Sequence, residues 1–326
     1  MSGLVKVLSI DGGGMRGVIP CMVLKDIEEI TGDRISDLFD LIGGTSTGGL
    51  ITLGLTKPGA KGRPEFSAKD ILELYEKHGT RIFHRSVWRK IESAWSLLDE
   101  KYSTKGLDEV LEEYFGDARL RDSVKPVIIP SYEIESRCAW FFRSERAKVS
   151  RSYDFLMKEV ARAASAAPTY FQPAKLMAEG DLDYYALIDG GVFANNPSLC
   201  TYVEARTLFP EAEDILFLSL GTGELTRRIS YDEAKGWGLA NWAHPILNVM
   251  FDGQSDTVDY QMEKLLQHSG SRRRYFRFQT RLDSGMDDLD DASEENIHDL
   301  KLEAQEMIDR HTEDLELLCD MLIGEG

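Results

Sequence analysis

Residues Val5–Gly17 read VKVLSIDGGGMRG, a short apolar run that ends in an aspartate and three consecutive glycines. Such a run is typical of a buried strand that leads into a tight turn. The residues that follow, Val18–Ile30, repeat apolar side chains at helical spacing. Short apolar runs and helical stretches alternate along the rest of the chain, which predicts a parallel sheet flanked by helices. Further strands are expected at 127–131, 138–142, 215–220 and 275–279, and further helices at 50–55, 155–167 and 197–208.

Two more glycine-rich turns follow predicted strands. Gly44–Gly48 reads GTSTG after the apolar run Leu38–Ile42, and Asp189–Gly191 reads DGG after Tyr184–Ile188. Turns at the carboxyl ends of parallel strands lie along one edge of the sheet, where ligands bind in open α/β folds. We therefore expect the three turns to form one site.

The turn Gly44–Gly48 has the GxSxG pattern of a nucleophile elbow, in which a serine, here Ser46, stands on a sharp turn between a strand and a helix. The flanking glycines relieve the crowding of such a turn, and the helix that follows offers free N–H groups near the serine. The alternative is an ordinary glycine turn in which Thr45, Ser46 or Thr47 caps the helix. The pentapeptide alone does not separate the two.

The glycines from Gly12 to Gly14 allow a backbone to approach a substrate closely and to point N–H groups at a developing oxyanion. Arg16 adds a positive charge nearby. Together with Gly17 these glycines also fit the GxGxxG fingerprint of dinucleotide sites, which needs an acidic residue at the end of the second strand. The nearest acidic residue, Asp33, follows no apolar strand, which argues against a dinucleotide site. The sequence contains no GxxxxGK(S/T) phosphate loop.

A serine nucleophile needs a base, and the sequence offers an aspartate more clearly than a histidine. Asp189 ends an apolar run and precedes two glycines. If the base were a histidine after this aspartate, as in α/β-hydrolases, His244 and His268 would be the candidates before the acidic tail. Neither follows a convincing strand, so both are expected to be surface or structural residues.

The motifs DGGGMRG, GTSTG and DGG, in this order between Leu4 and Pro197, resemble those of the patatin-like phospholipase family, whose relatives include calcium-independent and group IV phospholipases A2. The resemblance implies a three-layer α/β/α sandwich with a mainly parallel central sheet. It also implies a Ser–Asp dyad without histidine, with Ser46 as the nucleophile that forms an acyl-enzyme and Asp189 as the general base. The implied oxyanion hole consists of Gly12, Gly13, Gly14 and the amide of Thr47, with Arg16 in support.

The charge of the chain is uneven. The 326 residues carry a formal net charge of −18, which argues against a nucleic-acid polymer as a partner. Sixteen of the 56 acidic residues but only 2 of the 38 basic ones lie between Asp283 and Gly326. We therefore expect a catalytic domain over 1–280 and an acidic helical extension over 281–326 that packs on it. Within it, Leu300–Leu322 is expected to form one long helix, docked on the domain rather than serving dimerisation or regulation.

The resemblance further implies (lyso)phospholipid esters as substrates and transient contact with a membrane surface. Ile82–Lys90 mixes aromatic and basic residues, so it is either an interfacial segment or a core helix. No secretory signal and no membrane-spanning run is visible, so a cytoplasmic protein, peripheral at the inner membrane, is expected. An acyltransferase or thioesterase using the same dyad, or a non-catalytic storage or binding protein of the same fold, is the alternative.

Several bacterial members of the family resemble anti-phage effectors that are activated by cyclic nucleotides. A cyclic nucleotide activator is therefore an expectation, with Thr226–Arg228 and Arg272–Arg274 as candidate phosphate contacts or as ordinary surface arginines. A homo-oligomer is also left open. No cofactor is expected, because no metal-binding motif or cluster of cysteine and histidine occurs.

Overall fold

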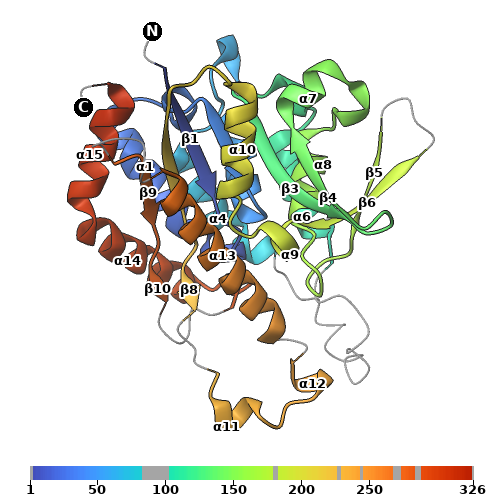
Figure 1. The fold of residues 1–326 in the computed structure, drawn as a ribbon. Coiled ribbons are helices and arrows are strands. Elements are labelled where there is room, and N and C mark those ends of the chain that lie inside the picture. The colour runs from blue at the N-terminus through green and yellow to red at the C-terminus, as the bar shows by residue number, and fades with distance from the viewer. Residues whose placement is uncertain are drawn as a thin grey trace.

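The structure of the protein is a computed structural model, and its described residues build one large sheet between two layers of helices (Figure 1). The sheet has eight strands in the order β5-β6-β3-β2-β1-β7-β9, with β4 paired to β3. The described residues are 3–82, 103–178, 183–225, 229–242, 245–266, 273–282 and 288–324. The strands are β1 (Leu4–Ile10), β2 (Leu41–Gly44), β3 (Val127–Glu133), β4 (Cys138–Arg143), β5 (Ala174–Met177), β6 (Tyr184–Asp189), β7 (Asp214–Leu220) and β9 (Tyr275–Phe278); β8 (Glu224–Leu225) and β10 (Arg281–Leu282) form a second, two-stranded sheet.

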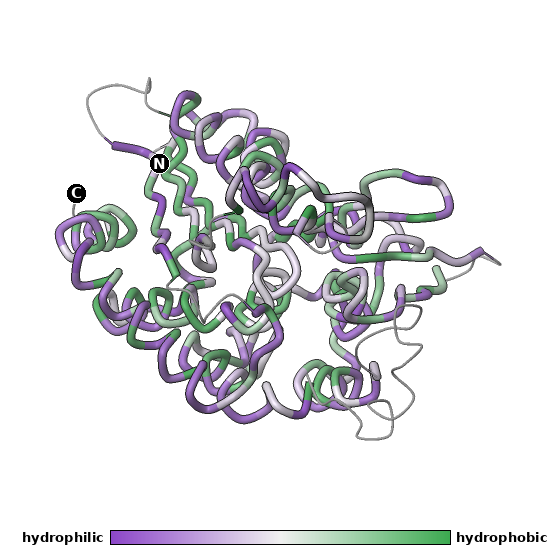
Figure 2. The backbone as a smooth tube through the Cα atoms, turned by 90° about the horizontal axis from the view of Figure 1, so that it is seen from below, coloured by the Kyte–Doolittle hydropathy of each residue, from purple (hydrophilic) through white to green (hydrophobic). Residues whose placement is uncertain are grey.

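The two faces of the sheet bury different helices. Alternate residues of a strand point to opposite faces, so Leu8 and Ile10 of β1 join one core cluster while Val5 and Val7 join another. The first cluster is completed by α1 (Val18–Thr31), α3 (Thr47–Thr56), α4 (Ala68–Ile82), α6 (Lys105–Phe115), α8 (Met157–Ala164), α14 (Glu294–Arg310) and α15 (Thr312–Ile323). The second is completed by α10 (Ser198–Leu208) and α13 (Pro245–Leu266). Seen from below, helices whose tubes alternate between hydrophilic and hydrophobic colours flank the sheet (Figure 2). The predicted three-layer sandwich is thereby confirmed.

The bounds of the helices agree with most of the predicted stretches and add several others. None of the helices in the described part of the chain combines the length and the apolar composition needed to cross a bilayer. The helices are α1 (Val18–Thr31), α2 (Ile35–Leu38), α3 (Thr47–Thr56), α4 (Ala68–Ile82), α6 (Lys105–Phe115), α7 (Ser144–Val149), α8 (Met157–Ala164), α9 (Gly191–Ala194), α10 (Ser198–Leu208), α11 (Tyr231–Ala234), α12 (Leu239–Trp242), α13 (Pro245–Leu266), α14 (Glu294–Arg310) and α15 (Thr312–Ile323).

The strand expected at Leu38–Ile42 begins later than predicted. Residues Ile35–Leu38 form the short helix α2 instead, and β2 starts at Leu41. Asp40 fixes this start, because its amide donates to the carbonyl of Lys6 at 2.8 Å and its carboxylate accepts the Lys6 amide at 2.9 Å. The apolar character of Leu38 therefore reflects its burial in a helical turn.

The single helix expected over Leu300–Leu322 is in fact two helices, so that prediction is wrong. The break is at His311, whose φ of −115° and ψ of 21° are not helical. Its amide still donates to the carbonyls of Met307 and Ile308, which closes α14, and its ring meets Phe278 edge-on. The bend keeps the apolar sides of both α14 and α15 in contact with α1. One straight helix of this length would extend away from α1.

Candidate active site

Strands β2 and β6 approach each other end to end along one edge of β3. β2 pairs with the start of β3 in the parallel direction, with Gly43 opposite Ile128. β6 pairs with the end of β3 in the antiparallel direction, with Asp189 opposite Ser131. Because β4 occupies the other edge of β3, the carboxyl ends of β2 and β6 point at one another. The turn after β2 therefore lies beside Asp189.

The three turns meet, but not because all three strands are parallel. The sequence predicts parallel strands, whereas β6 runs antiparallel to β3. The turns after β1 and β2 do lie at the same edge of parallel strands, since Ile10 pairs with Gly44. The turn after β6 joins them from the opposite direction.

Ser46 stands in a backbone conformation that few residues adopt. Its φ of 55° and ψ of −121° are a strained combination for a residue with a side chain, and α3 begins directly after it at Thr47. The neighbouring glycines leave no room for a side chain. A Cβ on Gly44 would lie 2.1 Å from the carbonyl oxygen of Gly48, and one on Gly48 would lie 2.2 Å from that of Ile10. The GxSxG pattern is thus required by close backbone contacts, as a nucleophile elbow requires.

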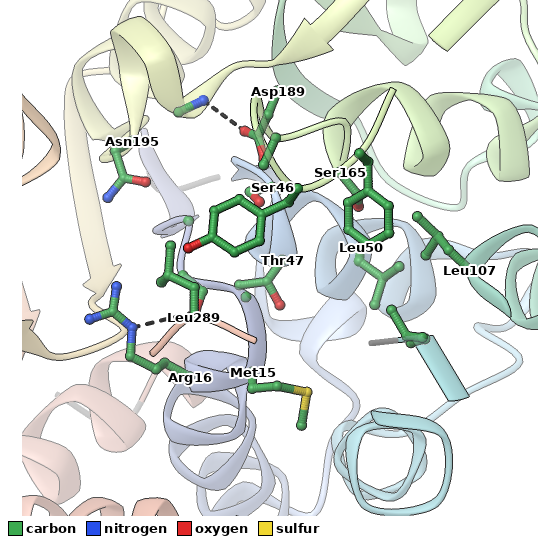
Figure 3. Close-up of a pocket in the computed structure, with 18 of the residues that line it drawn as sticks. Met15, Arg16, Ser46, Thr47, Leu50, Leu107, Ser165, Asp189, Asn195 and Leu289 are labelled. Atoms are coloured by element: carbon green, nitrogen blue, oxygen red, sulfur yellow. Dashed lines mark hydrogen bonds between the residues drawn. The ribbon is translucent and has the colours of Figure 1, made fainter. Parts of the chain in front are cut away.

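The Asp189 carboxylate is buried and faces Ser46 (Figure 3). One of its oxygens accepts the amide of Gly191 at 2.8 Å. Burial raises the pKa of Asp189 from 3.8 to about 6, and hydrogen bonds from the Ser46 hydroxyl and the Gly191 amide oppose this rise. The carboxylate is therefore still ionised at neutral pH, but it is a stronger base than an exposed aspartate.

Backbone amides from two turns remain available to a ligand. The amide of Gly12 donates to the carbonyl of Asn195 at 2.9 Å, so it is already used. The amides of Gly13, Gly14 and Thr47 have no hydrogen-bond acceptor among the described residues, and all three residues line the same pocket as Ser46. Of the predicted oxyanion-hole residues, Gly13, Gly14 and Thr47 thus retain free donors next to the serine.

Arg16 holds the glycine turn from behind. Its side chain is buried, and its guanidinium group lies 3.4 Å from the carbonyl oxygens of Gly13 and Gly223. Its direct contacts therefore stabilise the turn, whereas the sequence suggested a charge beside the oxyanion.

A buried ion pair that the sequence did not reveal supports the same turn. Arg277 of β9 donates to the carboxylate of Asp11 at 2.7 Å and to the hydroxyl of Ser219 at 2.8 Å. Both members of the pair are largely buried. Burial raises the pKa of Asp11, and the charge of Arg277 opposes that rise. Arg277 lies in a predicted strand without any motif, so nothing in the pattern of residues singled it out.

The pocket in front of Ser46 is mostly apolar, with a cavity volume of about 90 Å³. No histidine lines it among the described residues; His84, His244 and His268 lie outside them. Polar side chains also line it, namely those of Ser46, Asp189, Arg16, Thr47, Tyr75, Ser165, Tyr170 and Asn195. Its apolar wall consists of Met15, Leu50, Ile82, Leu107, Ala167, Phe171, Phe251 and Leu289.

The candidate phosphate contacts are engaged or lie outside the described residues. Arg273 forms an ion pair with Asp314, and Arg274 forms one with Asp214. The other candidates, Thr226–Arg228 and Arg272, lie outside the described residues. So does the candidate interfacial segment Ile82–Lys90, apart from Ile82 itself. The two described arginines thus already have carboxylate partners.

Comparison with known proteins points in one direction. The family model "Patatin-like phospholipase" matches residues 8–199. Patatin-like protein 4 of Arabidopsis thaliana is 34% identical over 337 residues, covering 94% of this chain and 84% of that protein. Patatin-T5 of Solanum tuberosum is 33% identical over 320 residues, covering 90% and 81%. "Probable inactive patatin-3-Kuras 1" of the same plant is 34% identical over 319 residues, covering 90% and 83%.

Solved structures with similar folds are more distant. VipD from Legionella pneumophila superposes with a TM-score of 0.37 at 12% identity, covering 94% of this chain and 67% of that chain. ExoU, in its complex with SpcU from Pseudomonas aeruginosa, gives a TM-score of 0.28 at 13% identity, covering 96% and 60%. TM-scores this low support no inference about function.

Proposed function

We propose, since the chain belongs to the patatin-like phospholipase family, that it is a serine lipid acyl hydrolase that cleaves (lyso)phospholipid esters through a Ser46–Asp189 dyad. The observation that carries the proposal is the contact between the Ser46 hydroxyl and the buried Asp189 carboxylate. "Probable inactive patatin-3-Kuras 1" is equally similar, so family membership alone does not establish activity, and the proposal depends on the site.

The arrangement supports a two-step reaction. Asp189 takes the proton of the Ser46 hydroxyl as its oxygen attacks the ester carbonyl, and the amides of Gly13, Gly14 and Thr47 stabilise the oxyanion. Asp189 then returns the proton to the departing alcohol, which leaves an acyl group on Ser46. Water, deprotonated by the same carboxylate, attacks this ester; Asp189 then returns the proton to the departing Ser46 oxygen, which frees the fatty acid and restores the hydroxyl. A pKa of about 6 suits Asp189 to both roles near neutral pH.

The walls of the pocket support a lipid acyl chain as the group transferred. The side chains of Leu50, Leu107 and Phe171 surround the space in front of Ser46 and offer a hydrocarbon chain an apolar environment. Charged substrates with short acyl groups would gain little from such a wall. The same dyad serves an acyltransferase or a thioesterase if the acceptor is not water, and these stay alternatives.

Covalent labelling of the serine tests the proposal most directly. A fluorophosphonate probe should modify Ser46 of the wild-type protein, and peptide mass spectrometry identifies the labelled residue. Ser46→Ala and Asp189→Asn should each lower phospholipid hydrolysis by about 10⁴-fold, as in other enzymes that lose a nucleophile or its base. Ser165→Ala, which alters another hydroxyl of the same pocket, should retain most of the activity. A protein that resists the probe and hydrolyses no ester would be a storage or binding protein.

Activity should also follow the ionisation of Asp189. The base works only when ionised, so kcat/KM for a small ester should rise with pH around a pKa of about 6 and level off above it. A profile that is flat between pH 5 and 8 would contradict Asp189 as the base.

Other predictions from the sequence are independent of the dyad. Activation by a cyclic nucleotide, a role in anti-phage defence, a homo-oligomer and a cytoplasmic location stay predictions. Hydrolysis of phospholipid vesicles measured with and without a panel of cyclic nucleotides tests the first of them. High activity that no nucleotide changes would end the idea of an activator.

A further inference from the structure

Helix α13 has two different faces along its first half. Residues three and four positions apart lie on the same side of a helix. Asn248, Asp252 and Ser255 share the side that lines a second hollow, next to the pocket in front of Ser46. Phe251, on the same side, also lines the pocket in front of Ser46. This side of the helix is therefore part of the site.

The opposite side of α13 is apolar and exposed. Ile246, Val249 and Met250 are spaced three and four positions apart and expose 39%, 44% and 49% of their surface. They share one side of the helix, which we call the α13 outer face. In a soluble helix this side would normally carry charged residues, because exposed aliphatic side chains gain nothing from water.

Neighbouring elements extend the apolar surface at the same end of the molecule. α11 and α12 lie beyond the carboxyl ends of the strands, and α12 packs against α13 (Figure 1). Tyr231 of α11 exposes 81% of its surface, and Trp237 packs edge-on against Trp242. Aromatic residues of this kind are favoured where a protein meets the boundary between lipid and water.

Carboxylates on the other side of α13 favour one kind of lipid headgroup over another. Glu224, Asp252 and Asp256 line the hollow next to the pocket. Burial raises the pKa of Glu224 and Asp252, and the charge of Asp256 adds to both shifts. Glu224 pairs with Arg281 and Arg16 lines the same hollow, so the repulsion that remains is between Asp252 and Asp256. A positively charged ammonium group would relieve this repulsion, whereas an anionic headgroup would increase it. The formal net charge of −18 acts in the same direction.

We propose that the α13 outer face is the surface by which the protein docks on a bilayer of zwitterionic phospholipid. The helix then touches lipid with Ile246, Val249 and Met250, while Phe251 on its other side lines the pocket in front of Ser46, so a single helix separates the bilayer from the site. The ammonium group of a lipid that enters the site meets Asp252 and Asp256, which line the hollow on the other side of the helix. This inference rests on the proposed hydrolase, because it names the surface on which the substrate is presented.

The test separates docking from catalysis. The triple variant Ile246→Gln, Val249→Gln, Met250→Gln is made in the Ser46→Ala background, and its binding to phosphatidylcholine vesicles is measured by co-sedimentation. We expect the triple variant to bind about tenfold or more weakly than Ser46→Ala alone, because three apolar side chains no longer enter the interface. With active Ser46, the triple variant should lose vesicle hydrolysis yet hydrolyse p-nitrophenyl butyrate at the wild-type rate.

A matched control removes the same number of exposed apolar side chains elsewhere. Val149→Gln, Val203→Gln and Leu317→Gln lie on α7, α10 and α15, toward the opposite end of the molecule from α11 and α12 (Figure 1). This control should bind vesicles as Ser46→Ala does. Equal losses in both triple variants, or unchanged binding in the first, would overturn the proposal.

Two further outcomes would contradict docking on a zwitterionic bilayer, and a third would separate it from the proposed function. Stronger binding when phosphatidylglycerol is added to the vesicles would contradict the role of the carboxylates. A wild-type dimer that the first triple variant dissociates, seen by size-exclusion chromatography with light scattering, would make a second copy of the chain the occupant. If wild type hydrolyses no ester but Ser46→Ala still binds vesicles through this face, the proposed function fails while the docking surface stands.

Discussion

The front and the back of the active site are built in different ways. The front consists of the three glycine turns after β1, β2 and β6, which carry Ser46, Asp189 and the free amides. The back consists of supports from the last third of the chain. There the hydroxyl of Thr222 donates to the carbonyl of Gly12 at 2.6 Å, Arg277 pairs with Asp11, and the carbonyl of Leu289 accepts the amide of Met15 at 2.8 Å.

This contrast shows which parts of a site can be recognised from a sequence. The front needs backbone conformations and close contacts that only glycine allows, so its residue types are fixed and its motifs are readable. The back needs only a hydrogen-bond donor, a positive charge or a carbonyl at a given place, and many residues or segments supply these. Its members therefore stand in the sequence without any pattern.

The largest expected effect comes from adding one methyl group at the front. Gly48→Ala puts a Cβ 2.2 Å from the carbonyl oxygen of Ile10, and backbone on both sides leaves no flexible group to move. We expect a loss of ~3 kcal/mol or more in the free energy of unfolding, measured with urea, and loss of ester hydrolysis.

A glycine outside the front provides the control. A Cβ on Gly253 would meet nothing within 4 Å, and the residue lies inside helix α13. Gly253→Ala should raise the free energy of unfolding by about 0.5–1 kcal/mol through helix propensity and leave hydrolysis of a soluble ester intact. If both alanine variants behaved alike, the contrast between front and back would not hold.

A comparably large effect is expected from removing the charge at the back. Arg277→Gln leaves the buried carboxylate of Asp11 without its counter-ion, which should lower the free energy of unfolding by about 3 kcal/mol. The double variant Asp11→Asn, Arg277→Gln should recover part of this loss, since no buried charge then lacks a partner. Urea unfolding of the two single variants and the double variant measures the coupling. Simple addition of the two single losses would show that the ion pair does not act as a unit.

A gain in stability, rather than a loss, separates catalysis from stability within the front itself. Burial raises the pKa of Asp189 to about 6, so ionising it opposes folding. The stability that the protonated group provides is fully present below its unfolded pKa near 4 and is lost as the pH rises through 6. Asp189→Asn should therefore gain roughly 3 kcal/mol of stability relative to wild type at pH 8 and less toward pH 4. Thermal unfolding across this pH range measures it; a variant destabilised at pH 8 would contradict a costly buried charge.

The sequence predicted the sandwich and most strands because buried apolar runs repeat between glycine turns. It did not predict the direction of β6, since periodicity indicates a strand without saying which neighbour it pairs with. Nor did it predict the break at His311, where the apolar spacing on either side is compatible with one continuous helix. Both were decided by packing between distant segments, against β3 and α1 respectively.

At the site, the motifs identified the residues that line the pocket but not the job of each. Gly12 and Arg16 belong to the same motif as Gly13 and Gly14, yet the amide of Gly12 and the guanidinium group of Arg16 are bound to backbone carbonyls. Such a division depends on where each group points, which residue identity does not specify. The sequence does not indicate the exposed outer face of α13 for a related reason. Ile246, Val249 and Met250 have the same spacing as an apolar stripe that is buried.

Because β2 and β6 meet end to end, the candidate site can form only late in synthesis and folding. Ser46 and Asp189 face each other only once both strands have docked on β3, and all three strands come from widely separated parts of the chain. Contacts of such long range form slowly, and no fragment emerging from a ribosome contains the complete pair until β6 has been synthesised. A chain that is still being made therefore lacks the proposed dyad, and recovery of esterase activity after dilution from denaturant would report the completion of the whole sheet.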